Sequence, residues 1–371
     1  MNRYFIFDKN INMRKIYRRT NKCIVYSLII FIIISLSSII SASTLINNNS
    51  LVFKQIIWYM IGFYIIYLIN NIDDDYIFNN YKILYILDNI LLLSLLIFAT
   101  PINNSKCWFS IGNISIQPSE FVKIILIITN AMIIDKSNKN IFLIIKIILL
   151  TIIPCILIFL EPDTGMIIIY FIISFIMLYT SGIDKKYFIL FILILSLLLS
   201  IFLSLYFYKS NTFINLFGSN FFYRIDRLLD WKNGSGMQLS NALIGIGSAF
   251  VFGFGFNNTP IYFPEPQTDF IFSVFAINYG FIGVIILLLT ILIFDINIIK
   301  LGIKSKNNID KYIISGISAS LIYQQIQNIG MNIGLLPITG ITLPFISYGG
   351  SSLISYMIML GIIIKIDKKS K

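Results

Sequence analysis

The stretch DFIFSVFAINYGFIGVIILLLTILI, residues 269–293, decides the fold class of this chain. A helix that crosses a membrane needs about 20 consecutive apolar residues, and this run is long enough to do so. Its single charged residue, Asp269, stands at the first position, directly before Phe270 and Ile271. Because a carboxylate beside hydrocarbon is costly to keep charged, Asp269 is a candidate functional residue.

Similar apolar runs recur along the whole sequence. The chain has 371 residues, of which 57% are hydrophobic and only 12% are charged, and its mean hydropathy is +0.85. A soluble domain carries about 25% charged residues, so the composition excludes an ordinary soluble globule. We therefore predict an all-α polytopic integral membrane protein with about ten transmembrane helices. The expected spans lie near 23–43, 51–71, 83–99, 119–134, 141–160, 165–182, 187–208, 269–293, 312–336 and 345–365.

The basic residues predict the orientation of this bundle. They give a net charge of +11 and gather before the first span, in alternate gaps between spans and after the last span. The positive-inside rule places such segments in the cytoplasm, which accounts for the charge without a nucleic-acid partner. Both termini are therefore predicted to be cytoplasmic. The predicted parts are a basic N-terminus at 1–22, a single transmembrane domain at 23–365 and a tail at 366–371.

Two polar interruptions then face the outside of the cell. They are residues 100–118 and the longer segment 209–268, which is predicted to be a large extracytoplasmic loop with short amphipathic helices. Within it, YRIDRLLDW at 223–231 has the spacing of a short amphipathic helix lying along the membrane surface. With this orientation Asp269 opens its span from the outer side.

The absence of histidine narrows the possible chemistry. A chain without histidine cannot use a His-based triad, His metal ligands or a His proton shuttle. Catalysis would have to use carboxylates, Lys, Tyr, Ser or a metal held by oxygen atoms. The three cysteines do not form a disulfide framework.

The first outward segment allows two interpretations. Ser119 is predicted to cap the helix that follows, with Glu120 and Lys123 three residues apart on one helix face. In the simpler interpretation these two residues form a local ion pair and Trp108 belongs to the aromatic belt. In the functional interpretation the segment forms a polar notch, in which Lys106 meets a phosphate and Trp108 stacks on a sugar or a lipid.

Asp269 also allows two interpretations. Either Thr268 or Asp269 caps the helix that begins there, which is a common role for these residue types. Alternatively, Asp269 is a general base whose pKa is raised by partial burial, with Phe270 and Phe272 as a dry wall.

The turn EPDTG at 161–165 is predicted to be structural. The glycines of 236–257 allow close approach of backbone to a ligand or of helix to helix.

Four segments together resemble one protein family. They are QPSEFVK at 117–123, EPDTG at 161–165, PEPQTDFIFSV at 264–274 and LLPITGITLPFISYGGSS at 335–352. In this order and spacing they resemble the SEDS family (shape, elongation, division and sporulation), the RodA and FtsW proteins of bacterial cell-wall synthesis. The similarity covers most of the chain, from Trp108 to about Tyr356, and is interpreted as closer to RodA than to FtsW.

The resemblance implies a peptidoglycan glycosyltransferase that polymerises lipid II, a disaccharide-peptide on undecaprenyl diphosphate. It would work at the outer face of the plasma membrane of a bacterium, with a class B penicillin-binding protein and the elongation or division machinery as partners. The family's essential carboxylate corresponds to Asp269, which would act as general base on the acceptor hydroxyl. A divalent metal ion, Mg or Mn, and Lys106 would offset charge on the diphosphate. The implied substrate-binding residues are Lys106, Trp108, Gln117, Ser119, Glu120, Lys123, Gln238 and Glu265.

The chain departs from the family pattern at several positions. Cys107 stands where the first outer loop usually has Arg, and Ile277 and Asn278 stand where a Glu-Glu pair is usual. These replacements leave open a non-catalytic scaffold for a penicillin-binding protein. A flippase for the lipid-linked precursor also stays open, because its spans and polar cavity would look similar. The enzyme hypothesis requires an outward cavity in which Asp269, Lys106 and Glu120 converge.

Overall fold

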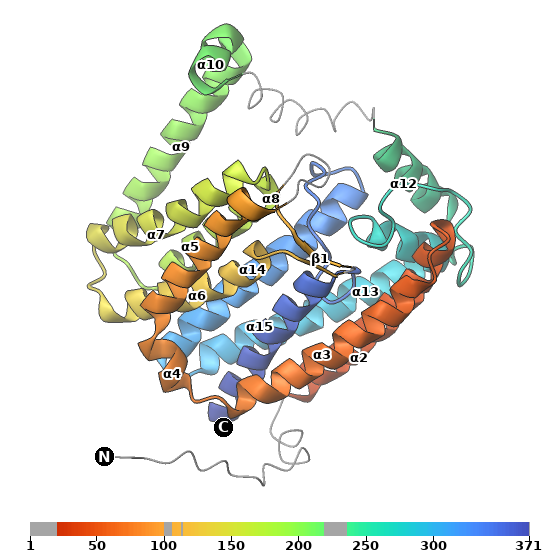
Figure 1. The fold of residues 1–371 in the computed structure, drawn as a ribbon, viewed down its shortest axis with the longest axis horizontal. Helices are drawn as coiled ribbons and strands as arrows, with labels where there is room; N and C mark the ends of the chain where they lie inside the picture. Colours follow the sequence, from red (N-terminus) through yellow and green to blue (C-terminus); the bar gives the residue numbers. More distant parts are fainter. Residues whose placement is uncertain (1–20, 100–105, 113, 219–235, 371) are drawn as a thin grey trace.

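The computed structural model describes residues 21–99, 106–112, 114–218 and 236–370, and the chain there is a bundle of long helices (Figure 1). The predicted N-terminal segment 1–22 lies almost wholly outside the described residues, as does the amphipathic helix predicted at 223–231. The helices are α2 (Lys22–Leu45), α3 (Ser50–Asn71), α4 (Asp74–Asn79), α5 (Tyr81–Phe98), α6 (Ser119–Lys136), α7 (Ile141–Leu160), α8 (Thr164–Thr180), α9 (Lys185–Tyr208), α10 (Ser210–Phe217), α12 (Met237–Ser248), α13 (Ile271–Lys304), α14 (Asn308–Asn332) and α15 (Gly350–Lys369).

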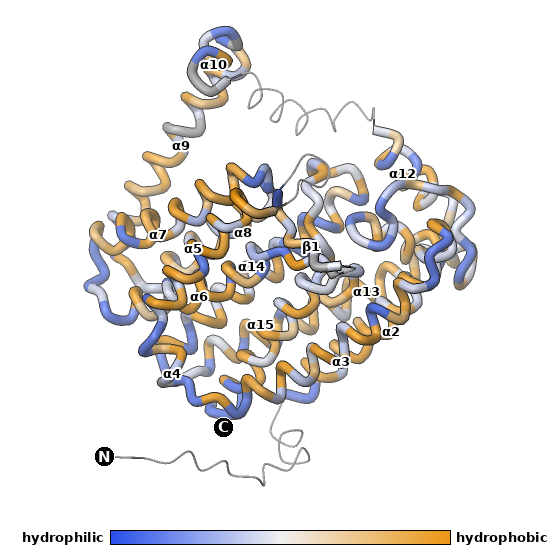
Figure 2. Tube along the Cα trace, in the orientation of Figure 1, coloured by the Kyte–Doolittle hydropathy of each residue, from blue (hydrophilic) through white to orange (hydrophobic). Residues whose placement is uncertain are grey.

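Each of the ten predicted spans is occupied by one helix, namely α2, α3, α5, α6, α7, α8, α9, α13, α14 and α15. Among the described residues, 7 helices are long and apolar enough to cross a membrane. Of the other three, α8 is apolar but shorter, whereas α6 and α14 carry more polar and charged side chains. Figure 2 shows apolar residues along the helices and polar residues at their ends. The protein is therefore a multi-pass membrane protein, as predicted.

The helical bundle carries one small β-hairpin that the sequence analysis did not predict. The first polar segment contains a two-stranded antiparallel hairpin, β1 (Phe109–Ile111) and β2 (Ile114–Ile116), in which Phe109 pairs with Ile116. Its sequence FSIGNISI alternates apolar and polar residues on both sides of the dipeptide Gly-Asn, which is a sequence pattern typical of hairpins. The hairpin projects Gln117 and the start of α6 toward the centre of the bundle.

Helix α13 is interrupted by a sharp irregularity at Gly280. This residue has φ 61° and ψ −161°, outside the helical region, so the helix is kinked there. A Cβ atom on Gly280 would lie 2.4 Å from the backbone nitrogen of Gly253, so only glycine fits where the segment after α12 reaches the helix. Phe254 and Phe281 supply backbone hydrogen bonds across this contact, to the carbonyls of Ile277 and Phe250. The kink therefore anchors the end of the 236–268 segment to α13.

Polar contacts gather the basic helix ends at one end of the bundle. Lys365 and Lys369 at the end of α15 form ion pairs with Asp74, and the backbone N–H of Asn21 donates to Asp367 at 2.6 Å. The turn between α7 and α8 and the segment that leads into α13 lie away from that end, and the hairpin lies near the middle of the bundle (Figure 1). This segregation agrees with the charge pattern, while the assignment of the basic end to the cytoplasm stays a prediction.

Candidate functional site

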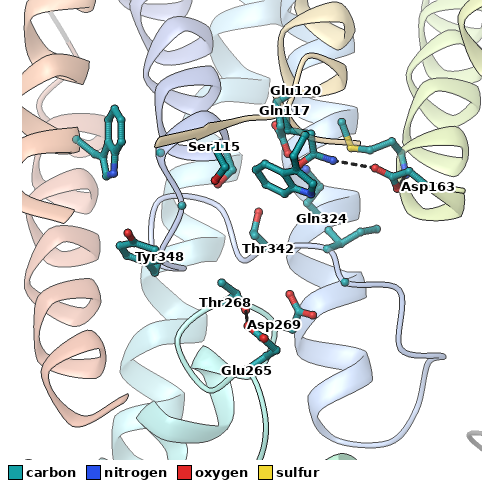
Figure 3. Close-up of a pocket in the computed structure, with 18 of the residues that line it drawn as sticks. Ser115, Gln117, Glu120, Asp163, Glu265, Thr268, Asp269, Gln324, Thr342 and Tyr348 are labelled. Carbon is teal, nitrogen blue, oxygen red and sulfur yellow. Dashed lines mark hydrogen bonds between the residues drawn. The ribbon is translucent and has the colours of Figure 1, made fainter. Parts of the chain in front are cut away.

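A cavity of about 640 Å³ lies toward the end of the bundle away from the basic helix ends. Figure 3 shows residues that line it. Its walls come from α3, the end of the hairpin, the first turn of α6, the turn before α8, α14 and two irregular segments, 265–269 and 339–350. Four carboxylates line it, Glu120, Asp163, Glu265 and Asp269. The rest of the lining is largely apolar, so the cavity combines apolar walls with a few polar groups, as ligand sites commonly do.

Asp269 lies in this cavity and does not cap α13. The helix begins at Ile271, its N-cap residue is Phe270, and the described structure has no side-chain hydrogen bond at this cap. The capping interpretation of Asp269 is therefore wrong. Phe270 is fully buried in the core and does not line the cavity, so it does not act as the predicted dry wall.

Two asparagines of α14 hold the backbone at Asp269. The side chains of Asn328 and Asn332 both donate to the Asp269 carbonyl oxygen, at 3.0 and 2.9 Å. Asn332 also accepts hydrogen bonds from the backbone and the hydroxyl of Ser273. The two asparagines are four residues apart, so they lie on the same face of α14. This clamp fixes the position of the carboxylate through its own main chain.

The segment 339–350 provides a second clamp. The Ser347 hydroxyl donates to the carbonyl of Thr268 at 2.7 Å, and the backbone N–H of Tyr348 donates to the carbonyl of Gln267 at 2.9 Å. A helix was predicted to begin at 345, but α15 starts at Gly350. Residues 345–349 are irregular because their backbone and side chains bind the segment that carries Asp269.

The surroundings of Asp269 change its acidity. Burial, and then the negative charge of Glu265, raise the pKa of Asp269 to about 7, while the Thr268 hydroxyl opposes the rise. Glu265 itself is exposed and accepts hydrogen bonds from the side chains of Gln267 and Thr268. A carboxylate with a pKa near neutrality can both accept and release a proton at physiological pH, which is what a general base requires.

Glu120 and Lys123 form an ion pair inside the bundle. Lys123 is fully buried and Glu120 is 4% exposed. The same carboxylate oxygen accepts a hydrogen bond from Ser355 at 2.8 Å, and the Lys123 ammonium lies 4.7 Å from the ring centroid of Tyr356. The predicted ion pair is thus confirmed. Glu120 reaches the cavity, whereas Lys123 lies behind it and binds α6 to α15.

Gln117 and Asp163 form one edge of the cavity (Figure 3). The Gln117 side chain donates to one oxygen of Asp163 at 2.8 Å, and the other oxygen accepts from the backbone N–H of Met166, which caps α8. Burial is the main cause that raises the pKa of Asp163 to about 6. The EPDTG turn was predicted to be structural, and the structure gives its Asp163 both a capping role and a place in the cavity.

The structure brings five of the nine predicted site residues together. Trp108, Gln117, Glu120, Glu265 and Asp269 line the cavity. The predicted convergence of Asp269, Lys106 and Glu120 is only partly right, because the Lys106 ammonium donates to the carbonyl of Leu96 at 2.9 Å and is not part of the lining. That carbonyl lies near the end of α5, where it has no helical partner and attracts a cation.

The other predicted residues support the cavity from behind. Ser119 was predicted to cap α6, but the N-cap is Pro118 and the Ser119 hydroxyl makes no hydrogen bond to any described residue. Proline can take this place because it already lacks the N–H that a helix start leaves unpaired. Gln238 of α12 donates to the carbonyl of Pro264 at 3.0 Å and so supports the segment that leads to Asp269.

Sequence reasoning missed several residues that line the cavity. Among them are Lys54 and Trp58 of α3, Gln324 of α14 and Tyr348. On α3 the lining residues fall at positions 54, 57, 58 and 61, the spacing of one helix face. A lysine inside the otherwise apolar stretch SLVFKQIIWYMIGF was the available signal, since charged residues within a span have functional roles by default.

The departures from the family pattern lie outside the cavity lining. Cys107 is buried, and its thiol donates to the backbone carbonyl of Glu161 at 2.8 Å. Ile277 packs against α12 at Gly245. A Cβ atom added at Gly245 would lie only 2.5 Å from the Cδ1 of Ile277. The side chain of Asn278 accepts from Thr259 at 2.8 Å and donates to Ser41, which joins α13 to α2. Ile277 and Asn278 thus have structural roles in this chain.

The cavity offers oxygen donors of the kind that hard divalent ions prefer. Glu265 and Asp269 are two carboxylates in one cavity, and Mg²⁺ is commonly held by one or two carboxylates together with substrate phosphates. The described residues contain no group of three or more His, Cys, Asp or Glu side chains that would hold a metal by themselves. The donor set therefore fits an ion that arrives with a phosphorylated substrate.

Comparison with known sequences agrees with this geometry. A family model described as "Cell cycle protein", which covers FtsW, RodA and SpoVE, matches residues 17–371. The chain is 32% identical over 365 residues to a protein named "Probable peptidoglycan glycosyltransferase FtsW" from Buchnera aphidicola subsp. Baizongia pistaciae. That match covers 93% of this chain and 92% of the relative.

Solved structures have the same fold. One, described as "Structural coordination of polymerization and crosslinking by a peptidoglycan synthase complex", is 22% identical with a TM-score of 0.80 and covers 95% of this chain and 98% of that one. The rod shape-determining protein RodA of Thermus thermophilus is 22% identical with a TM-score of 0.69 and covers 94% and 97%. The greater likeness to RodA stays a prediction, because the sequence relative carries the FtsW name and the RodA similarity shows the fold alone. Given the match over residues 17–371, the chain belongs to the cell cycle protein family of FtsW, RodA and SpoVE.

Proposed function

We propose that this chain is a peptidoglycan glycosyltransferase that polymerises lipid II at the outer face of the inner, plasma membrane of a bacterium. Family membership supports the reaction class, as does the name of the FtsW relative. The observation that carries the proposal is the position of Asp269. Its carboxylate lies in a cavity at the end of a membrane bundle, is held through its backbone by α14, and is not used as a helix cap.

Asp269 acts as the general base in the proposed reaction. Its carboxylate accepts the proton of the 4-hydroxyl group on the acceptor sugar, and that oxygen attacks the anomeric carbon of the donor sugar. The new glycosidic C–O bond forms as the bond between the anomeric carbon and the phosphate oxygen breaks. The lipid diphosphate leaves with the bonding electrons, and the configuration at the anomeric carbon inverts. A base within about 3 Å of the hydroxyl is needed for this step.

Other residues of the cavity bind and orient the sugars. Trp108 provides an aromatic face for a sugar ring, and the Gln117–Asp163 pair provides hydrogen-bonding groups beside it. Glu265 is the residue that would hold a divalent ion, Mg or Mn, together with oxygens of the substrate. Such an ion supplies charge neutralisation for the diphosphate when bound.

The proposed partner is a class B penicillin-binding protein that crosslinks the new strands within the elongation or division machinery. The fold shared with a chain of a peptidoglycan synthase complex supports this partner. The direct test gives labelled lipid II and Mg²⁺ to the purified chain with this partner. We expect glycan polymer to form. Translocation of lipid II across liposomes without polymer would instead identify a flippase, and partner binding with neither activity would identify a scaffold.

The pKa of Asp269 predicts the pH dependence of polymerisation. The base works only as the carboxylate, so the rate should rise with pH through about 7 and level off above it. Because the negative charge of Glu265 helps to raise this pKa, Glu265→Gln should lower it. The rise of the polymerisation rate should then occur at lower pH. The control is Asp184→Asn, which removes an exposed negative charge at the start of α9 and should leave the pH dependence of the rate unchanged. An unchanged pH dependence in Glu265→Gln would contradict the assignment of Asp269 as the base.

A further inference from the structure

The cavity has one cationic side chain among the residues that the structure describes as its lining, and that residue is Lys54. The two lysines that the sequence predicted at the site, Lys106 and Lys123, make other contacts. Lys106 donates to the carbonyl of Leu96, and Lys123 is buried in its ion pair with Glu120. The loop position of the usual family arginine is occupied by Cys107, whose thiol is buried. Among the described residues, positive charge thus reaches an anionic group in the cavity from Lys54.

Lys54 is placed on a well-fixed wall. It belongs to the α3 face that also presents Ile57, Trp58 and Ile61 to the cavity. The Trp58 indole packs closely on Gly350 at the start of α15. A Cβ atom added at Gly350 would lie only 2.7 Å from the Cε2 of Trp58. Lys54 itself is half-buried, and no ion pair or hydrogen bond joins its ammonium to another described residue. The ammonium is thus available to a ligand.

The helix that carries Lys54 and the segment that carries Asp269 both contact residues 345–348. Gln55 is fully buried, and its side chain donates to the carbonyl of Ser347 at 3.3 Å. The Tyr59 hydroxyl donates to the carbonyl of Phe345. Since Ser347 also holds the carbonyl of Thr268, the segment 345–348 ties α3 to the base. The backbones at Lys54 and Asp269 are therefore joined through one segment.

The charge of the cavity requires a cation for the proposed substrate. A diphosphate that enters beside Asp163, Glu265 and Asp269 is repelled by their negative charge. We propose that Lys54 binds the diphosphate of the polyprenyl-linked substrate, an assignment that rests on the proposed function. A lysine ammonium is a compact charge on a flexible stem and can follow a phosphate whose position changes during the reaction.

The test measures binding of undecaprenyl diphosphate to the full-length protein in nanodiscs of neutral lipid. Lys54→Gln should weaken binding about ten-fold to a hundred-fold, the loss expected for one hydrogen bond to a charged group. Lys54→Arg keeps the charge and should retain binding within a few-fold. The matched control Lys82→Gln removes an exposed lysine of α5 that does not line the cavity and should bind like the wild type.

Two further measurements separate the possible outcomes. Undecaprenol, which lacks phosphate, should not compete. If phosphatidylglycerol competes as well as the diphosphate, the site is a general lipid headgroup site and the assignment is overturned. Wild-type binding by Lys54→Gln, together with a wild-type KM for lipid II, would overturn the inference while the glycosyltransferase function stands. Absence of polymer from the wild type, with binding that depends on Lys54, would overturn only the proposed function.

Discussion

Replacing Asp269 by Asn should lower the rate of glycan polymerisation by about a hundred-fold to ten-thousand-fold, the usual contribution of a general base. The amide has nearly the shape of the carboxylate, but it cannot accept the proton of the acceptor hydroxyl. The backbone clamp should survive, because Asn328 and Asn332 bind the main-chain carbonyl and not the side chain. Polymer is measured from labelled lipid II, with thermal unfolding as the check on folding.

Two variants make this experiment specific. Asp184→Asn replaces an exposed carboxylate outside the cavity and should polymerise normally. Asp269→Glu keeps the charge but lengthens the side chain, which lies close to Gly340. A Cβ atom added at Gly340 would be 3.6 Å from the Oδ2 atom of Asp269. It should also be impaired, because a base displaced by about 1 Å loses much of its effect. Activity of Asp269→Asn above half that of the wild type would show that another group accepts the proton.

Replacing Lys123 by Ala should destabilise the protein by about 3–5 kcal/mol, the cost of leaving the charge of a buried partner unpaired. Glu120 is 4% exposed, and among the described residues it keeps the hydrogen bond from Ser355 once the ammonium is gone. The loss also removes the contact of the ammonium with the Tyr356 ring. We expect a lower midpoint in thermal unfolding of the detergent-solubilised protein.

The double variant Glu120→Ala with Lys123→Ala tests the cause of this effect. If the unpaired charge dominates, the double variant is more stable than Lys123→Ala alone, because both charges are absent. Lys82→Ala, an exposed position of α5, should change the free energy of unfolding by no more than about 0.5 kcal/mol. A Lys123→Ala protein as stable as this control would mean that the ion pair contributes little to the fold.

The helices could be predicted from the sequence because each has to satisfy its own backbone within lipid. Hydropathy alone therefore located all ten spans, and most of their ends lie within a few residues of the prediction. The prediction failed where tertiary contacts with distant segments hold the backbone in an irregular conformation. The start of α15 was placed at 345, yet Phe345 has φ 64° and the helix begins at Gly350, because the intervening residues bind Gln267 and Thr268.

The site was predictable only in part, for a related reason. Asp269 and Glu120 are charged residues at the ends of apolar runs, so their cost in lipid marks them in the sequence. Lys106 has the same appearance, but its tertiary contact with the Leu96 carbonyl takes it away from the cavity. Lys54 was missed because hydropathy treats a single lysine near a helix end as one that reaches toward the membrane surface.

The asparagine clamp makes the backbone at Asp269 and α14 a single mechanical unit. Asn328 and Asn332 grip the carbonyl of Asp269 from one helix, and Asn328 also holds the carbonyl of Ile341 across the cavity. Any sliding or rotation of α14 must therefore carry both rims of the cavity with it. A change in the position of α14 would therefore move Asp269 and Ile341 together.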